Sequence, residues 1–86
     1  MAPLAARRTA EMVRLGRRVT AVELVVAGQA AELRGAALGR GTAKALRLLR
    51  QRISYVQAGE PLPDVEPVVE LVASGALGPG SLTGEA

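Results

Sequence analysis

The first 34 residues contain nothing that must interrupt a helix, and this uninterrupted stretch constrains the fold more than any other feature. Pro3 suits a first helical turn, Gly16 costs a helix about 1 kcal/mol, and Gly35 is a typical C-terminal stop. At about 1.5 Å per residue, one helix over residues 2–34 would be roughly 50 Å long. A compact domain of this size is only roughly 30 Å across. The helix must therefore bend at Gly16 or pack along neighbours that this chain does not supply.

Residues 19–33 of this helix are apolar on nearly every side. Positions spaced alternately by three and four residues form the a/d pattern of helices that pack lengthwise. These positions are Met12, Leu15, Val19, Val22, Val26, Gln29 and Leu33. A helix that is apolar all round belongs to the interior of a large protein or to a membrane. A membrane span is excluded because Glu23 interrupts the best apolar run, which has fewer than about 18 uncharged residues.

The composition limits what a chain of 86 residues can do alone. One domain of this size buries only about 60–65% of the surface of its unfolded chain. The sequence has one Tyr and no Phe or Trp, so its core depends on smaller apolar residues. Without Cys or His it lacks disulfides, the commonest metal ligands and the commonest general base. We therefore expect that the isolated chain folds with low stability and that it belongs to a larger assembly.

The N-terminus carries no recognisable secretory signal, because Arg7 and Arg8 are followed by alternating polar and apolar residues. An organellar transit peptide is disfavoured because the same pattern continues into the core helix. The absence of Cys suits a reducing compartment. The sequence therefore predicts a cytoplasmic protein.

Charge is divided unevenly along the chain. Residues 1–53 hold all eleven Lys and Arg against three acids, and residues 54–86 hold five acids and no base, which gives +8 and −5. This asymmetry raises the hypothesis of a nucleic-acid or acidic protein partner. The bases concerned are Arg14, Arg17, Arg18, Arg40, Lys44, Arg47, Arg50 and Arg52. Since no aromatic residues are interleaved with them for base stacking, a solvated face is the favoured interpretation and nucleic acid is the less favoured partner.

A second helix is predicted over residues 43–53, after a glycine-containing linker. Thr42 is a suitable N-cap, and Leu46, Leu49 and Ile53 share one face. Residues 54–63, which include a glycine and two prolines, are predicted to form a loop.

A third helix is predicted over residues 65–74, with Asp64 as its N-cap. Its buried stripe would consist of Val65, Val68, Val69 and Val72. The glycine-rich residues 79–86 are predicted to be a disordered tail. The predicted organisation is thus one helical segment, residues 1–78, followed by that tail.

A few polar residues are candidates for chemistry. Glu23 and Glu32 lie in the apolar helix, where burial can prepare a carboxyl group for acid–base catalysis. Nine residues separate them and place them on different sides of the helix, so pairing with an Arg or a backbone group is the favoured interpretation. Gln29, at an a/d position, is predicted to set register between packed helices. Tyr55 has no visible partner and is interpreted as a packing residue.

The string LGRGTAK at residues 38–44 only loosely resembles a phosphate-binding loop. That motif needs a preceding strand and the order Gly-Lys-Ser/Thr, whereas the order here is Gly-Thr-Ala-Lys. We therefore reject a nucleotide site, and we assign no catalytic, cofactor-binding or metal-binding residue to the chain.

Three segments form one long pattern: RRVTAVELVVAGQAAELRG, LGRGTAKALRLLRQRI and EPLPDVEPVVELVASGAL. In the first, the informative positions are Arg18, Val19, Glu23, Leu24, Gln29, Leu33 and Arg34. The pattern resembles the C-terminal part of the histidine and aromatic amino acid ammonia-lyases and related aminomutases. Those enzymes typically carry arginine-valine, an apolar step, Glu-Leu, small residues, glutamine and Leu-Arg along a core helix. The resemblance covers about residues 1–78.

The resemblance implies an all-α piece of a homotetramer, in which one long core helix is followed by two shorter helices. It implies the elimination of ammonia from histidine or an aromatic amino acid in full-length relatives. The family's cofactor is a methylidene-imidazolone formed from an Ala-Ser-Gly tripeptide upstream of the matching region, so no cofactor is expected in this chain. The chain is therefore expected to be a truncated or split product.

Residues 73–75 do read Ala-Ser-Gly. However, Ser74 is predicted to end a short helix, which does not provide the strained, enclosed loop that cyclisation requires. In the resemblance, this segment matches a late helix end without a catalytic role. We interpret Ser74 as part of a helix C-cap.

The chain also departs from the family pattern. Glu60 stands where members often have an arginine, in a turn that is one residue shorter. Thr20 and Gly28 replace larger or more helix-favouring residues, which predicts less tight packing.

The leading hypothesis is a helical C-terminal fragment of an ammonia-lyase-like enzyme, inactive alone, with self-association or a separate N-terminal lyase chain as its partner and no membrane contact. The alternative is a small basic helical module that binds nucleic acid or an acidic protein. A third hypothesis is a stand-alone oligomer held together by the apolar helix.

Overall fold

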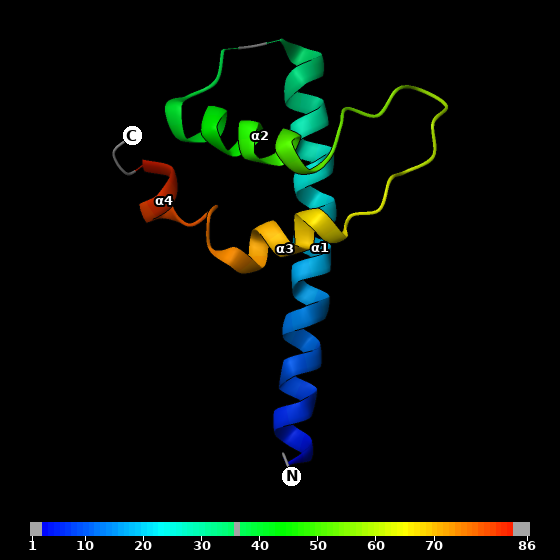
Figure 1. Cartoon of the computed structure of the whole chain (residues 1–86), viewed down its shortest axis with the longest axis vertical. Coiled ribbons are helices and arrows are strands. Elements are labelled where there is room, and N and C mark those ends of the chain that lie inside the picture. Colours follow the sequence, from blue (N-terminus) through cyan, green and yellow to red (C-terminus); the bar gives the residue numbers. More distant parts are fainter. Residues whose placement is uncertain (1–2, 36, 84–86) are drawn as a thin grey trace.

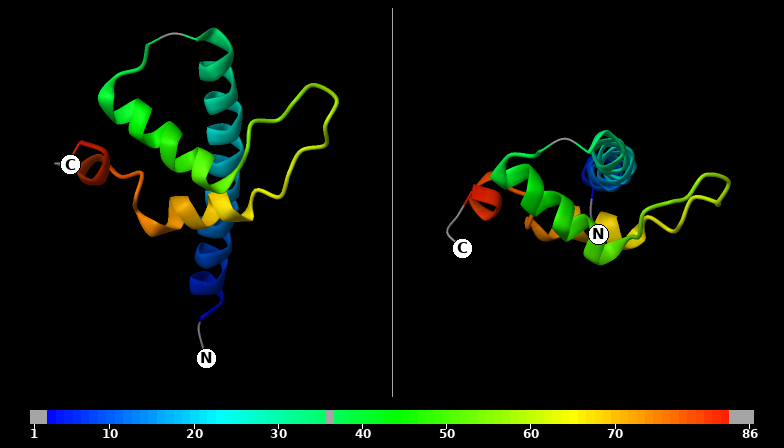
Figure 2. Two further views of the ribbon diagram at one scale, coloured as in Figure 1. Left: turned by 45° about the horizontal axis from the view of Figure 1, so that its top comes forward. Right: turned by 90° about the horizontal axis from the view of Figure 1, so that it is seen from above.

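The computed structural model describes residues 3–35 and 37–83, which contain four helices and no strand (Figure 1). The helices are α1 (Leu4–Arg34), α2 (Arg40–Arg52), α3 (Glu66–Ser74) and α4 (Pro79–Thr83). The predicted all-α class with one long helix is confirmed. The molecule is flat, with principal extents of 50 × 38 × 16 Å. Viewed along α1, the other three helices lie on one side of it (Figure 2).

The long helix α1 runs for 31 residues and passes through Gly16 without a break. It ends at Gly35, whose φ of +64° is a left-handed conformation that favours glycine. The Gly35 N–H donates to the carbonyl oxygens of Ala31 and Glu32, at 3.3 and 3.2 Å. Residues 3–20 are all exposed, and this half of α1 extends beyond the other helices (Figure 1). The predicted continuous helix is confirmed, and its predicted first residue lies outside the described residues.

Helix α2 begins three residues earlier than predicted, at Arg40, so the prediction that Thr42 is its N-cap is wrong. Gly39 is the N-cap instead, with an extended backbone, and its carbonyl oxygen accepts the Ala43 N–H at 2.8 Å. Glycine is an acceptable N-cap because its backbone adopts this conformation readily. The helix ends at Arg52, where Ile53 returns to an extended conformation.

Helix α3 begins one residue later than predicted, with Val65 at the N-cap position. Asp64 still serves the helix start, since its Oδ1 accepts the Glu66 N–H at 3.0 Å. The buried residues of α3 are Val68 and Leu71. The predicted stripe therefore included Val68 but missed Leu71.

Where the sequence predicts a disordered tail from residue 79, the structure has the short helix α4. Lys44 on α2 holds it in place, because its Nζ donates to the Ser81 carbonyl oxygen at 2.7 Å. This contact joins residues 37 positions apart, which local composition cannot predict. Residues 84–86 of the predicted tail lie outside the described residues.

The core forms where α1, α2 and α3 meet. It comprises the buried residues Ala21, Val25, Leu49, Ile53 and Val68, with Leu24, Leu46, Val65 and Val69 packed against them. The predicted apolar face of α2 is thereby confirmed. The core is small because α1 contributes only two buried side chains, both from its C-terminal half.

Gly28 brings α1 and α2 close together. A Cβ atom at this position would lie 2.5 Å from Leu49 Cδ2 and 3.3 Å from Leu46 Cδ1, so any side chain would displace the buried Leu49 and press on the half-buried Leu46. We predicted looser packing from Gly28, and that prediction is wrong because the missing side chain allows a closer helix contact. Thr20, the other departure, is exposed.

Candidate interaction surface

The predicted a/d positions of α1 form an apolar stripe that the rest of the described chain leaves exposed. We call Met12, Leu15, Val19, Val22, Val26 and Leu33 the outer stripe. Their exposed fractions run from 41% at Val22 to 71% at Leu33, and Leu4 is also exposed, at 59%. Single exposed apolar residues are ordinary, but a contiguous row of this length marks an interaction site. The outer stripe is therefore the main candidate functional surface.

A different face of α1 packs inside the chain. Ala21 and Val25 are buried, and Leu24 and Gly28 are half-buried. At about 100° per residue, these positions lie on the other side of the helix from the outer stripe. This inner face carries the smaller residues, so α2 and α3 can approach closely. The a/d spacing therefore did not identify the face used inside this chain, and lengthwise packing of the outer stripe stays a prediction.

Gln29 connects α1 to the start of the loop between α2 and α3. Its Nε2 donates to the Val56 carbonyl oxygen at 2.5 Å, and its Oε1 accepts the Val56 N–H at 3.2 Å. The amide side chain thus satisfies both backbone groups of one loop residue. We predicted that Gln29 sets register between packed helices. That prediction is wrong, because its partner is a loop backbone.

One turn further along α1, Glu32 forms an ion pair with Arg50 of α2. Arg50 Nε donates to Glu32 Oε1 at 2.8 Å, and Arg50 Nη1 donates to the Ile53 carbonyl oxygen at 3.2 Å. The Arg50 guanidinium also lies 5.8 Å from the centre of the Tyr55 ring, within cation–π range. The structural interpretations of Glu32 and Tyr55 are confirmed. Together these contacts fix the end of α2 and the loop start.

The remaining candidate carboxylate, Glu23, is exposed beside the outer stripe and has no hydrogen bond or ion pair within the described residues. Nine residues of one helix, a rise of about 14 Å, separate it from Glu32. Among residues 3–35 and 37–83, no three acidic side chains gather as a metal site would require. The structure therefore brings no acid–base pair together at either glutamate.

Ser74 caps the C-terminus of α3. Its Oγ donates to the Leu71 carbonyl oxygen at 2.6 Å and accepts the Ala76 N–H at 3.1 Å. Gly75 follows in the left-handed conformation, with φ +81°. The predicted C-cap role of Ser74 and Gly75 is confirmed.

Several of the basic residues contact this chain itself. Arg18 Nη1 lies 2.6 Å from Glu66 Oε2, and Arg52 Nη1 donates to the Pro67 carbonyl oxygen at 3.3 Å. Lys44 and Arg50 have the contacts described above. The two oppositely charged parts of the chain thus neutralise each other in part. The residues of the string LGRGTAK from Arg40 onwards lie in the first turns of α2, with no strand before them among the described residues.

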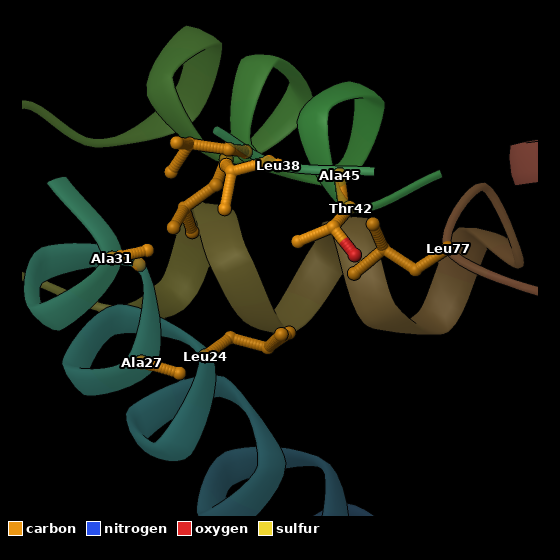
Figure 3. Close-up of a pocket in the computed structure, with 10 residues that line it drawn as sticks. Leu24, Ala27, Ala31, Leu38, Thr42, Ala45 and Leu77 are labelled. Atoms are coloured by element: carbon orange, nitrogen blue, oxygen red, sulfur yellow. The ribbon is translucent and has the colours of Figure 1, made fainter. Parts of the chain in front are cut away.

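An apolar cavity of ≈ 120 Å³ lies between α1 and α2 (Figure 3). Its lining residues are Leu24, Ala27, Gly28, Ala31, Leu38, Thr42, Ala45, Leu46, Leu49 and Leu77. Thr42 supplies the only side-chain oxygen in this lining. The cavity therefore lacks the convergent polar groups that a substrate site uses to orient its ligand.

None of the helices in the described part of the chain, α1 included, combines the length and apolar character needed to cross a membrane.

Comparison with known proteins finds similarity to two enzymes. The chain is 31% identical over 83 residues to a histidine ammonia-lyase of Clostridium tetani, a match that covers 90% of this chain and 16% of that protein. It is 36% identical over 76 residues to a histidine ammonia-lyase of Treponema denticola, covering 86% of this chain and 15% of that protein. The chain thus spans about one sixth of the length of these relatives. No protein-family model matches the chain. No solved structure matches it at comparable significance.

Proposed function

We propose that this chain is a helical assembly segment of an ammonia-lyase-like enzyme. The two similar proteins are histidine ammonia-lyases, and the matches run along nearly the whole chain, which is the observation that carries the proposal. The enzyme would eliminate ammonia from histidine or an aromatic amino acid. In this proposal the chain contributes packing surfaces, and other segments contribute the methylidene-imidazolone and the catalytic side chains.

The side chains of this chain support a packing role. Glu32 is engaged with Arg50, and Gln29 is engaged with the Val56 backbone, so both groups hold the loop in place. The Ser74 hydroxyl makes two hydrogen bonds at a helix end. A serine held in this way has the ordinary geometry of a C-cap, not the strained turn that a cyclised tripeptide needs.

The outer stripe supports the assembly part of the proposal. A bundle of long helices buries apolar rows spaced by three and four residues, and α1 offers such a row from Met12 to Leu33. The exposed first half of α1 provides packing length beyond the small core.

The experiment is an assay of ammonia release from L-histidine, L-phenylalanine and L-tyrosine. We expect no release by the purified chain and release when it is co-purified with a lyase-like chain that contains its own Ala-Ser-Gly loop, the product of the neighbouring open reading frame being the first to test. Ser74→Ala should leave the activity of the combined enzyme unchanged. Release by the chain alone, abolished by Ser74→Ala, would overturn the proposal and assign the cofactor to residues 73–75.

A further inference from the structure

We infer that the apolar cavity between α1 and α2 binds a small uncharged molecule, with an apolar body of about four to six carbon atoms and a single hydroxyl group. The inference goes beyond the proposed function and does not depend on it, because it stands on the size and lining of this cavity. The lining has no charged side chain to match the ammonium and carboxylate groups of an amino acid. The ligand therefore differs in class from a lyase substrate.

The size of the cavity sets the size of the ligand. Its volume is ≈ 120 Å³. An apolar cavity of about 150 Å³ engineered into another protein binds benzene, so a slightly smaller body, such as a chain of about four carbon atoms, fits here. Protein interiors are normally close-packed, with few voids larger than a water molecule. A space of this volume is therefore a distinctive feature beside so small a core.

Small side chains create this space. Beside the contact at Gly28, α1 presents Ala27 and Ala31 to the cavity, and α2 presents Ala45 (Figure 3). Three methyl groups leave room between the helices that larger side chains would fill. The longer side chains that enclose the space are Leu24, Leu38, Leu46, Leu49 and Leu77.

The lining favours an apolar ligand over water. Almost all of the lining surface is apolar, and Thr42 supplies its only side-chain oxygen. A buried water molecule needs about two to four polar partners, which this lining does not offer. Displacing such poorly held water by an apolar group is favourable.

Thr42 accounts for the hydroxyl group of the ligand. It lies in the first turn of α2 and extends toward Leu24, beside Leu77 (Figure 3). Among residues 3–35 and 37–83, no group is hydrogen-bonded to its Oγ1. A threonine hydroxyl both donates and accepts hydrogen bonds. It therefore matches one uncharged hydroxyl group of a ligand.

One wall of the cavity is held by a contact that is distant in sequence. Leu77 lies between the turn at Gly75, which ends α3, and the start of α4. Lys44 Nζ donates to the Ser81 carbonyl oxygen at 2.7 Å and so ties α4 to α2, the helix that carries Thr42. The segment of Leu77 is thus anchored at both ends. The cavity is formed before a ligand enters, as is usual for small-molecule sites.

The first test titrates the full chain, isotopically labelled at its leucine methyl groups, with n-butanol and with benzene in an NMR experiment. We expect both probes to shift the methyl signals of Leu24, Leu46 and Leu77, with dissociation constants of about 1 mM, which so few ligand atoms can supply. The signals of Leu33 and Leu62, which are 71% and 64% exposed and outside the lining, should not move. Butyrate, which carries a charged carboxylate in place of the hydroxyl, should shift none of these signals.

The second test fills the cavity. Ala31→Leu should weaken the binding of both probes by at least about 10-fold, because the added side chain occupies their space. Ala30→Leu is the matched control, since Ala30 is the adjacent residue but is exposed and outside the lining, and it should bind both probes like the parent chain. Ala45→Leu fills the same space from α2 and replaces Ala31→Leu if circular dichroism shows that the latter loses its helices.

The third test removes the hydroxyl group of the lining. Thr42→Val should weaken the binding of n-butanol by about 5-fold, the equivalent of one ordinary hydrogen bond. The same variant should leave the binding of benzene unchanged, because benzene has no hydroxyl group. An equal effect on both probes, or no effect on either, overturns the assignment of the hydroxyl group to Thr42.

The inference is overturned if the signals of the lining leucines stay in place at about ten times the expected dissociation constant. Shifts that are as large at Leu33 as at Leu24 also overturn it, since the probes would then bind exposed apolar surface in general. Equal weakening by Ala31→Leu and Ala30→Leu has the same meaning. Loss of binding in Ala31→Leu alone supports the inference. Failure of the ammonia-release complementation leaves these results intact and counts against the lyase role alone.

Discussion

Gly16→Ala and Gly28→Ala make the same chemical change in the same helix but in different surroundings. Alanine is about 1 kcal/mol more favourable than glycine inside a helix. Nothing lies within 4 Å of a Cβ atom added at Gly16, so Gly16→Ala should gain this full amount. Both substitutions have the same backbone effect. The difference between their free energies of unfolding therefore measures the contact of α1 with α2.

At Gly28 the added Cβ would lie 2.5 Å from Leu49 Cδ2. Leu49 is only 4% exposed and cannot move into solvent, so it must change rotamer within the core. Such overpacking costs about 1–3 kcal/mol. The alanine backbone offsets about 1 kcal/mol of this cost, so Gly28→Ala should lower the free energy of unfolding by about 0–2 kcal/mol.

The assay is urea unfolding followed by circular dichroism at one chain concentration, because self-association shifts apparent stability. We expect Gly16→Ala to be about 1–3 kcal/mol more stable than Gly28→Ala, and each kcal/mol corresponds to about 4–8 °C in melting temperature. If Gly28→Ala stabilises the chain as much as Gly16→Ala does, then α1 and α2 do not approach each other at Gly28, and the reasoning is refuted.

Three further perturbations test the core and the loop contacts. A double-mutant cycle with Glu32→Gln and Arg50→Met should give a coupling free energy of about 1 kcal/mol, because the pair is only partly exposed. Gln29→Met should destabilise the chain by about 1–3 kcal/mol, since Val56 loses both of its hydrogen-bond partners, and hydrogen exchange of the Val56 amide should accelerate. Leu49→Ala should cost about 2–5 kcal/mol in chemical unfolding, because it empties part of the core.

Matched controls sharpen these three measurements. The pair Arg18–Glu66 has side chains that are about half exposed, at 48% and 47%, and its cycle should give a smaller coupling than Glu32–Arg50. Val13→Ala, at an exposed position, should change stability by less than about 0.5 kcal/mol. An equal loss for Val13→Ala and Leu49→Ala would contradict the position of the core.

The first three helices were predictable to within a few residues, whereas α4 was missed, since it contacts the distant Lys44. Helix α1 was predicted as one piece because Gly16, the glycine in its first half, costs helix stability only about 1 kcal/mol. The start of α2 was misplaced because Thr42 and Gly39 are about equally suitable N-caps by residue type, so local sequence does not decide between them. Boundary errors of this size are usual where several residues can cap.

The candidate surface was only partly predictable. The spacing from Met12 to Leu33 predicted a stripe that packs lengthwise, but α1 is apolar on two sides, and spacing cannot tell which side faces its own chain. Residue size decided it in the structure: Ala21 and Gly28 allow α2 and α3 to approach, and the larger valines and leucines of the outer stripe remain exposed. The contact of Gln29 with Val56 spans 27 residues and carries no local signal.

By itself, the sequence determined the all-α class, the unbroken length of α1 and the glycine stops at Gly35 and Gly75, because each of these depends on backbone preferences within a few residues. The tertiary structure alone decided which face of α1 is inner and which is outer, and it joined Glu32 to Arg50 and Gln29 to Val56. These outcomes depend on how closely two helices can approach and which distant groups then meet, and such distances are set by packed volumes, not by local sequence.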